Sequence, residues 1–161
     1  MILSTHAVVG GAIASLFSSH PALVVVAAFA SHFAIDAIPH WDYPLRAITL
    51  KRGANNRHLL VDRRLFRDFA LIGFDACAGL LIAIWLFATP ATIGVIVLGA
   101  LAGMMPDPLQ FLHSVFPSQP LTALQRFHEW IHTKWTLRWP LGVSSQALFA
   151  AAVSWIVLIV G

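Results

Sequence analysis

The chain has 161 residues, of which 58% are apolar and 11% are charged, and its mean hydropathy is +0.78. Soluble domains carry roughly 25% charged residues, so this composition excludes an ordinary water-soluble globule, a disordered tail and a disulfide-linked scaffold. The sequence therefore predicts an integral membrane protein. A length of 161 residues allows about five spans of ~20 residues, which predicts a single membrane-embedded helical domain over residues 1–161.

The expected fold is all-α, a polytopic bundle of about five spans plus one interfacial helix. Only the third and the fifth apolar runs reach the length that a ~30 Å hydrocarbon core requires, so the others are expected to be tilted, partly re-entrant or shielded. Small residues within the runs favour close helix packing in lipid. The five runs are Ala7–Phe17, Leu23–Ile38, Phe69–Ala88, Ile93–Met105 and Leu141–Val160.

Every Lys and Arg lies in one of two segments, residues 46–67 and 126–138. The positive-inside bias places both segments, and with them the N-terminus, on the cytoplasmic side. No cation precedes the first apolar run, so a secretory signal peptide is not expected. The basic residues behind the net charge of +3 are interpreted as a topology signal and as a contact for anionic lipid head groups. No nucleic-acid partner is expected.

The most informative stretch runs from Ser31 to Pro44. His32 and Asp36 are four residues apart and share one face of a helix, and Pro39 ends that helix so that His40 and Asp42 can fold back toward the same place. Ionisable groups at this depth are rare and usually paired or functional. The stretch predicts either half of a metal site or a His–Asp pair that only pins two helices together.

A second cluster, Phe127-His-Glu-Trp-Ile-His-Thr-Lys-Trp135, contains an H-E-x-x-H pattern. His128 and His132 lie one helical turn apart, and Glu129 occupies the position of the general base in zinc metalloproteases. Apolar residues at helical spacing and nearby tryptophans predict a helix along the cytoplasmic interface. The alternative is an interfacial helix whose histidines have no function.

Two further residues complete the candidate set. Asp107 stands between Pro106 and Pro108 where the fourth run returns to the cytoplasm, so it is expected to leave regular helix and present its carboxylate at the membrane surface. His6 precedes the first run on the same side. Asp75 lies within the third run and needs a partner or a proton.

These clusters are expected to converge on the cytoplasmic side of the membrane. A mixed set of imidazoles and carboxylates fits one or two divalent ions, zinc or manganese, which activate water and bind phosphoester oxygens. The predicted function is hydrolysis of a phospholipid or polyprenyl-phosphate-like lipid, with Asp36, Asp107 and Glu129 as candidate catalytic residues. The candidate metal ligands are His6, His32, Asp36, His40, Asp107, His128 and His132.

Four motifs together resemble the small bacterial inner-membrane proteins grouped as membrane-bound metal-dependent hydrolases (the YdjM-like families). The motifs are Thr5-His6, the His32-x3-Asp36-x2-Pro39-His40-x-Asp42 run, Pro106-Asp107 and the His128-x3-His132 pair. The His32-x3-Asp36 part of the second motif is also similar to the His-x3-Asp motif of zinc-dependent phospholipase C and P1-type nucleases. The resemblance implies a bacterial inner-membrane location and a metal set of His6, His32, Asp36, Asp107, His128 and His132.

Two other functions remain open. A membrane metalloprotease would use His128, Glu129 and His132, with Asp107 or Asp36 as a third ligand. A non-enzymatic channel or structural subunit is the other class; a channel would need polar residues through the whole bilayer depth, and a structural subunit would tolerate alanine at every candidate ligand.

Overall fold

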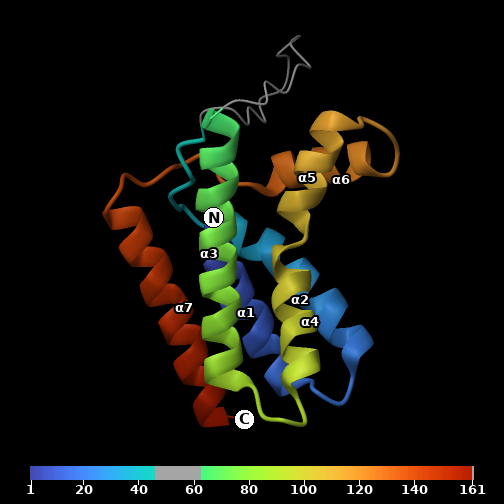
Figure 1. Ribbon diagram of the computed structural model, residues 1–161, viewed down its shortest axis with the longest axis vertical. Helices are drawn as coiled ribbons and strands as arrows, with labels where there is room; N and C mark the ends of the chain where they lie inside the picture. Colours follow the sequence, from blue (N-terminus) through green and yellow to red (C-terminus); the bar gives the residue numbers. More distant parts are fainter. Residues whose placement is uncertain (46–62, 161) are drawn as a thin grey trace.

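A computed structural model describes residues 1–45 and 63–160. All regular elements in these ranges are helices (Figure 1), which confirms the all-α prediction for the described part of the chain. The helices are α1 (Leu3–Leu16), α2 (Pro21–Asp36), α3 (Arg63–Phe87), α4 (Ile93–Met104), α5 (Pro106–Val115), α6 (Leu121–Ile131) and α7 (Leu141–Val160).

Two helices, α3 and α7, are long and apolar enough to cross a membrane. The pair α4 and α5 passes the same test as one span with a bend of 47°, so the structure supports two or three spans. Helices α1 and α2 are apolar but shorter, and the prediction of about five spans stays a prediction for them. Four of the basic residues used to predict the orientation lie outside the described residues: Arg46, Lys51, Arg52 and Arg57.

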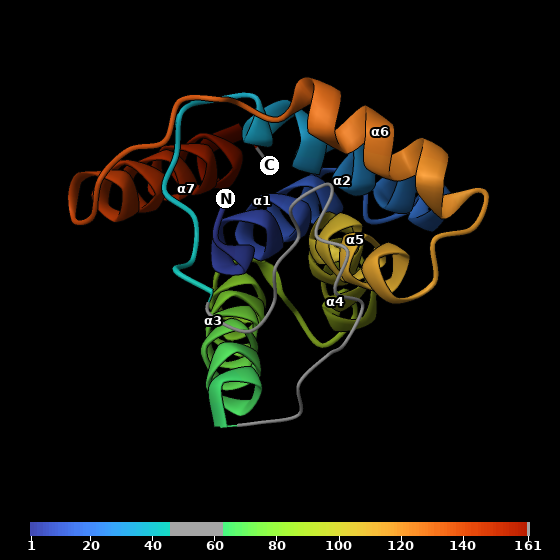
Figure 2. The ribbon, with the colours of Figure 1, turned by 90° about the horizontal axis from the view of Figure 1, so that it is seen from above.

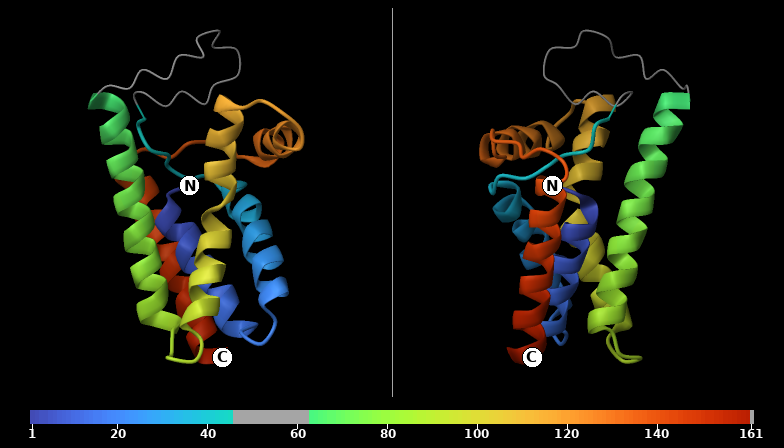
Figure 3. Two further views of the ribbon diagram at one scale, coloured as in Figure 1. Left: turned by 45° about the vertical axis from the view of Figure 1, so that its right-hand side comes forward. Right: turned by 90° about the vertical axis from the view of Figure 1, so that its left-hand side faces the viewer.

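Helix α1 lies at the centre of the bundle and contacts α2, α3, α4 and α7. The α1–α2 and α3–α4 corners lie at the same end of the bundle as the C-terminus, whereas α6 crosses the opposite end (Figures 1 and 3). The view along the bundle shows α2 and α4 on one side of α1 and α7 on the other (Figure 2). The long helices α3 and α7 keep large apolar side chains exposed, such as Trp85 and Trp155, as expected for helices that face lipid tails.

Close backbone approach fixes the position of α1. A Cβ added at Gly79 of α3 would lie 2.3 Å from the Cα of Ser4, and one added at Gly103 of α4 would lie 2.6 Å from the backbone oxygen of His6. Both distances are too short for a real Cβ, so glycine is required on each side of the first turns of α1. The helix that carries His6 is thereby held against both neighbours.

The chain breaks between α4 and α5 at Met105, and the bend there is 47°. The sequence argument that the prolines interrupt a regular helix is correct, but its placement of Asp107 in an irregular turn is wrong. Asp107 lies in the first turn of α5, which begins at Pro106. A proline is tolerated in a first turn because the N–H groups there have no intrahelical acceptor.

The connection after α6 is hydrogen-bonded to the segment after α2. The N–H of Thr133 donates to the backbone oxygen of Asp36 (2.9 Å), and the N–H of Leu137 donates to that of His40 (2.8 Å). An isolated bridge also joins His40 to Thr136. These contacts place the end of α6 directly beside the end of α2.

Candidate metal centre

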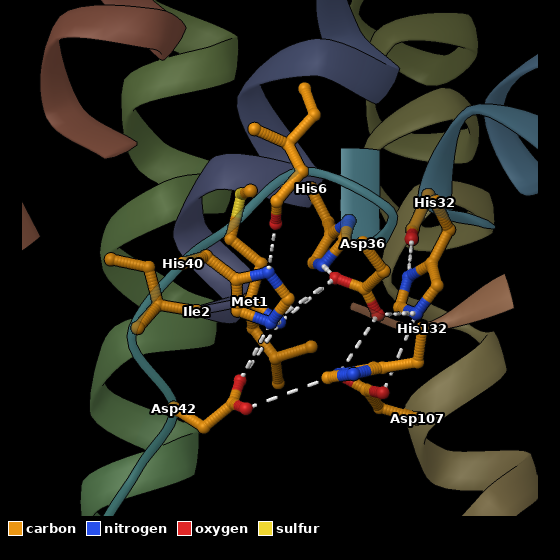
Figure 4. Close-up of polar contacts among 12 residues, drawn as sticks. Met1, Ile2, His6, His32, Asp36, His40, Asp42, Asp107 and His132 are labelled. Carbon is orange, nitrogen blue, oxygen red and sulfur yellow. Dashed lines mark hydrogen bonds and ion pairs between the residues drawn. The ribbon is translucent and has the colours of Figure 1, made fainter. Parts of the chain in front are cut away.

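Asp36, at the C-terminal end of α2, lies at the centre of a cluster of polar side chains (Figure 4). Its side chain is 1% exposed. The Oδ1 atom is 3.2 Å from Nε2 of His6, and the Oδ2 atom is 3.2 Å from Nε2 of His32 and 3.0 Å from Nε2 of His128. Histidines from α1, α2 and α6 therefore face one carboxylate, although they lie far apart in the sequence.

Asp107 extends this arrangement from α5. Its Oδ1 atom is 3.4 Å from Nε2 of His32. Ligand atoms of His32, Asp36, Asp107 and His128 all lie within 4.8 Å of one another, a first group that could hold a metal ion. A tetrahedral zinc ion with bonds of about 2.0–2.1 Å separates its ligand atoms by about 3.4 Å. The His–carboxylate distances of 3.2 Å, 3.4 Å and 3.0 Å within the group are close to this spacing.

A second group shares Asp36 with the first and consists of Asp36, His40 and His132. The Nε2 atoms of His40 and His132 each lie 4.0 Å from an oxygen of Asp36. Asp42 faces the same two histidines, with Oδ1 3.0 Å from His40 and Oδ2 3.9 Å from His132. Asp42 was not among the candidate ligands, although the His40-x-Asp42 spacing after Pro39 carried the signal.

Three of the histidines are oriented by backbone carbonyl groups. The Nδ1–H of His32 donates to Gly103 (2.9 Å), that of His40 to Ile38 (2.7 Å) and that of His132 to Thr133 (2.9 Å). A carbonyl oxygen only accepts, so Nδ1 must carry the proton in each ring. In the neutral ring the Nε2 lone pair then points at the carboxylates, an arrangement typical of metal-binding histidines.

His6 and His32 are stacked, with ring centroids 3.8 Å apart and an interplanar angle of 17°. Both side chains are fully buried. Among the described residues, both nitrogens of His6 and Nε2 of His32 find no partner in hydrogen-bonding geometry. Two stacked buried rings cannot both carry a positive charge at low cost. The unpartnered ring nitrogens, together with the nearby carboxylates, therefore favour the binding of a cation. The residues present thus fit a divalent metal ion.

The amino group of Met1 lies in the second group. Its nitrogen is 2.8 Å from Oδ1 of Asp36, 2.9 Å from Nε2 of His40 and 3.1 Å from Oδ1 of Asp42. Sequence reasoning did not find this contact. The ammonium group occupies the space between these acceptors, so a metal ion held by the second group would have to displace it.

The first turn of α1 is held by side chains from three other segments. Gln146 of α7 accepts from the N–H of Ile2 (2.9 Å), the Tyr43 hydroxyl from that of Leu3 (2.8 Å), and Asp75 of α3 from that of Ser4 (2.8 Å). These N–H groups have no acceptor within the helix, so each bond satisfies a donor that would otherwise be unpaired. The three bonds fix the end of α1 that carries His6.

Asp75 was expected to need a partner, and it has two. Besides the Ser4 N–H, it accepts a hydrogen bond from the hydroxyl of Tyr43. Burial, followed by the interaction with Asp75, raises the pKa of Tyr43 well above its ordinary value. Tyr43 is therefore a neutral donor that links the α1 terminus to α3.

Glu129 belongs to neither of the two ligand groups found among the described residues. It is exposed on α6, and its Oε1 atom accepts from Nε2 of Gln125 (3.2 Å). Helix α6 ends at Ile131, so His132 lies just beyond it, and His128 and His132 belong to different ligand groups. This arrangement departs from the metalloprotease interpretation, in which both histidines bind the same ion from one helix.

No family model, curated protein or solved structure matches the chain.

Proposed function

We propose that this protein is a membrane-embedded, metal-dependent hydrolase of phosphoesters, with a phospholipid or another lipid phosphate as substrate. The observation that carries the proposal is the set of histidines whose Nδ1–H groups are bound to carbonyl oxygens, so that their Nε2 atoms face shared carboxylates. A divalent ion bound there supplies Lewis acidity and lowers the pKa of a bound water.

Two groups of residues in this chain would hold the metal. His32, Asp36, Asp107 and His128 form the first group, and Asp36, His40 and His132 form the second. Asp36 belongs to both groups, and the ring of His6 stacks on that of His32. Zinc suits this mixture of imidazole and carboxylate, and manganese is the alternative.

The position of the cluster supports a lipid substrate. The end of the bundle that holds the cluster also holds α6, whose Trp130 is 77% exposed, and the following connection, whose Trp135 is 77% exposed. Tryptophans are enriched at the membrane–water interface. Arg126, Lys134 and Arg138 lie on the same segments, which supports a cytoplasmic position in a bacterial inner membrane and an anionic lipid head group as partner.

Metal analysis of the purified protein in detergent tests the proposal. We expect divalent metal in the wild type, hydrolysis of bis-para-nitrophenyl phosphate or of phosphatidylglycerol vesicles, and the loss of both in His32→Ala. His20→Ala is the matched control, because the His20 side chain is exposed at the α1–α2 corner and forms a hydrogen bond with the neighbouring Ser19. Absence of metal from the wild type, or undiminished metal in His32→Ala, would contradict the proposal.

The same measurements separate the alternatives. A structural subunit would tolerate His32→Ala without loss of any activity. A metalloprotease would cleave a protein substrate such as casein and would lose that activity in Glu129→Gln while it kept its metal. We expect no casein cleavage, because His128 and His132 lie in different ligand groups.

A further inference from the structure

A cavity of about 270 Å³ opens beside the ligand cluster. Two of its lining residues, His128 and His132, belong one to each ligand group, so the cavity borders both. It is slightly smaller than the roughly 300–1,000 Å³ of pockets that enclose a whole small molecule. The full lining consists of Gln110, His128, Glu129, His132, Thr133 and Lys134.

The charges around the cavity restrict what it can bind. Lys134 contributes one positive charge and Glu129 one negative charge, and Gln110 contributes an amide that can donate a hydrogen bond. The lining outside the metal ligands is therefore neutral in total. A phosphodiester group carries a single negative charge and suits such a lining, whereas the second phosphate of a diphosphate would meet the carboxylate of Glu129.

The backbone holds Lys134 at this position. The neighbouring Thr133 donates its N–H to the backbone oxygen of Asp36, and its own carbonyl oxygen accepts from Nδ1 of His132. Lys134 is thus attached directly to a residue that is bonded to both ligand groups. Arg138, four residues further along, is also exposed but does not line the cavity.

We propose that this cavity is the subsite for a phosphodiester group, with Lys134 and Gln110 binding the phosphate oxygens that do not contact the metal centre. The inference rests on the proposed function and specifies its substrate class. The cavity holds the head-group phosphate of a substrate, and the volume leaves the remainder of the molecule outside.

Binding of dimethyl phosphate to the manganese-loaded full-length protein, followed by phosphorus NMR relaxation, tests the subsite without requiring turnover. We expect Lys134→Ala to weaken binding roughly tenfold, the lower end for a hydrogen bond to a charged group, because Lys134 is exposed. Arg138→Ala removes an equal charge from the same connection outside the cavity and should leave binding within about twofold. Metal content should be unchanged in both variants.

A second variant tests the role of Glu129. Glu129→Gln should strengthen the binding of pyrophosphate about fivefold more than that of dimethyl phosphate, because the second phosphate no longer meets a carboxylate. Equal effects on the two probes would contradict the proposed selectivity for a phosphodiester.

Three results would overturn the subsite: equal weakening by Lys134→Ala and Arg138→Ala, loss of metal in Lys134→Ala, or no effect of Lys134→Ala on binding. If the wild type hydrolyses phosphodiesters but Lys134→Ala binds normally, the subsite fails and the proposed function stands. If binding depends on Lys134 but nothing is hydrolysed, the proposed function fails and the subsite stands. The same tenfold rise in KM with phosphatidylglycerol vesicles identifies a lipid head group, and an effect on dimethyl phosphate alone identifies a soluble phosphodiester.

Discussion

Asp36→Asn removes the one carboxylate that both ligand groups share. The substitution keeps the size of the side chain, but it replaces one of the two acceptor oxygens by an NH2 donor and removes the negative charge that would neutralise bound metal. We therefore expect Asp36→Asn to lose both ions. Asp107→Asn should lose only the ion of the first group, and His132→Ala only that of the second.

The size of the effect follows from linkage. Replacing a residue that merely supports a metal ligand costs about 10–100-fold in affinity, so loss of the ligand itself should cost at least about 100-fold. At a metal concentration of 100 times the dissociation constant, each ion stabilises the folded protein by about 2.7 kcal/mol. A site weakened 100-fold contributes only about 0.4 kcal/mol at that concentration.

Thermal unfolding in detergent with and without added zinc measures this difference, and metal analysis counts the ions. The wild type should show a large zinc-dependent increase in Tm, Asp107→Asn and His132→Ala a partial increase, and Asp36→Asn almost none. If Asp36→Asn retains a full ion, or if its Tm rises with zinc as much as that of the wild type, Asp36 does not join two metal sites.

Two further predictions concern the first turns of α1. Gly79→Ala should lower Tm, with a cost of about 1–3 kcal/mol for overpacking, because its Cβ would lie 2.3 Å from Ser4; Gly73→Ala on the same helix meets nothing within 4 Å and should leave Tm unchanged or raised. A Tm decrease of equal size in both variants would contradict the packing argument. The pKa of Tyr43 is raised from 10.0 by burial and then by Asp75, so its contribution to stability is complete below pH 10.0 and declines as the pH rises above that value. The Tm difference between wild type and Tyr43→Phe should therefore be constant up to about pH 10 and narrow from there to about pH 11; a difference that stays constant above about pH 10 would refute the assignment.

Much of the cluster was predictable from local spacing. His32 and Asp36 share a helical face at a separation of four residues, and Pro39 lets the chain turn so that His40 returns to Asp36. The orientation of the apolar runs predicted that His6 and His128 would join them at the same end of the bundle. These inferences needed only helical periodicity and a consistent topology.

Other features depend on contacts that no local pattern specifies. The bond between Gln146 and the N–H of Ile2 joins residues 144 positions apart, and the depth of α1 in the bundle decides whether it forms. Asp107 was misplaced for a different reason. Two prolines end one helix, but the same residues are compatible with the first turn of the next, and the sequence does not distinguish these outcomes.

The break at Met105 has a consequence for the protonation of the centre. The last carbonyl groups of a helix have no N–H partner within it, and that of Gly103 accepts a hydrogen bond from the Nδ1–H of His32. In an unbroken helix this oxygen would accept a hydrogen bond from the main-chain N–H four residues further along. The interruption between α4 and α5 thus selects the tautomer of an imidazole on α2.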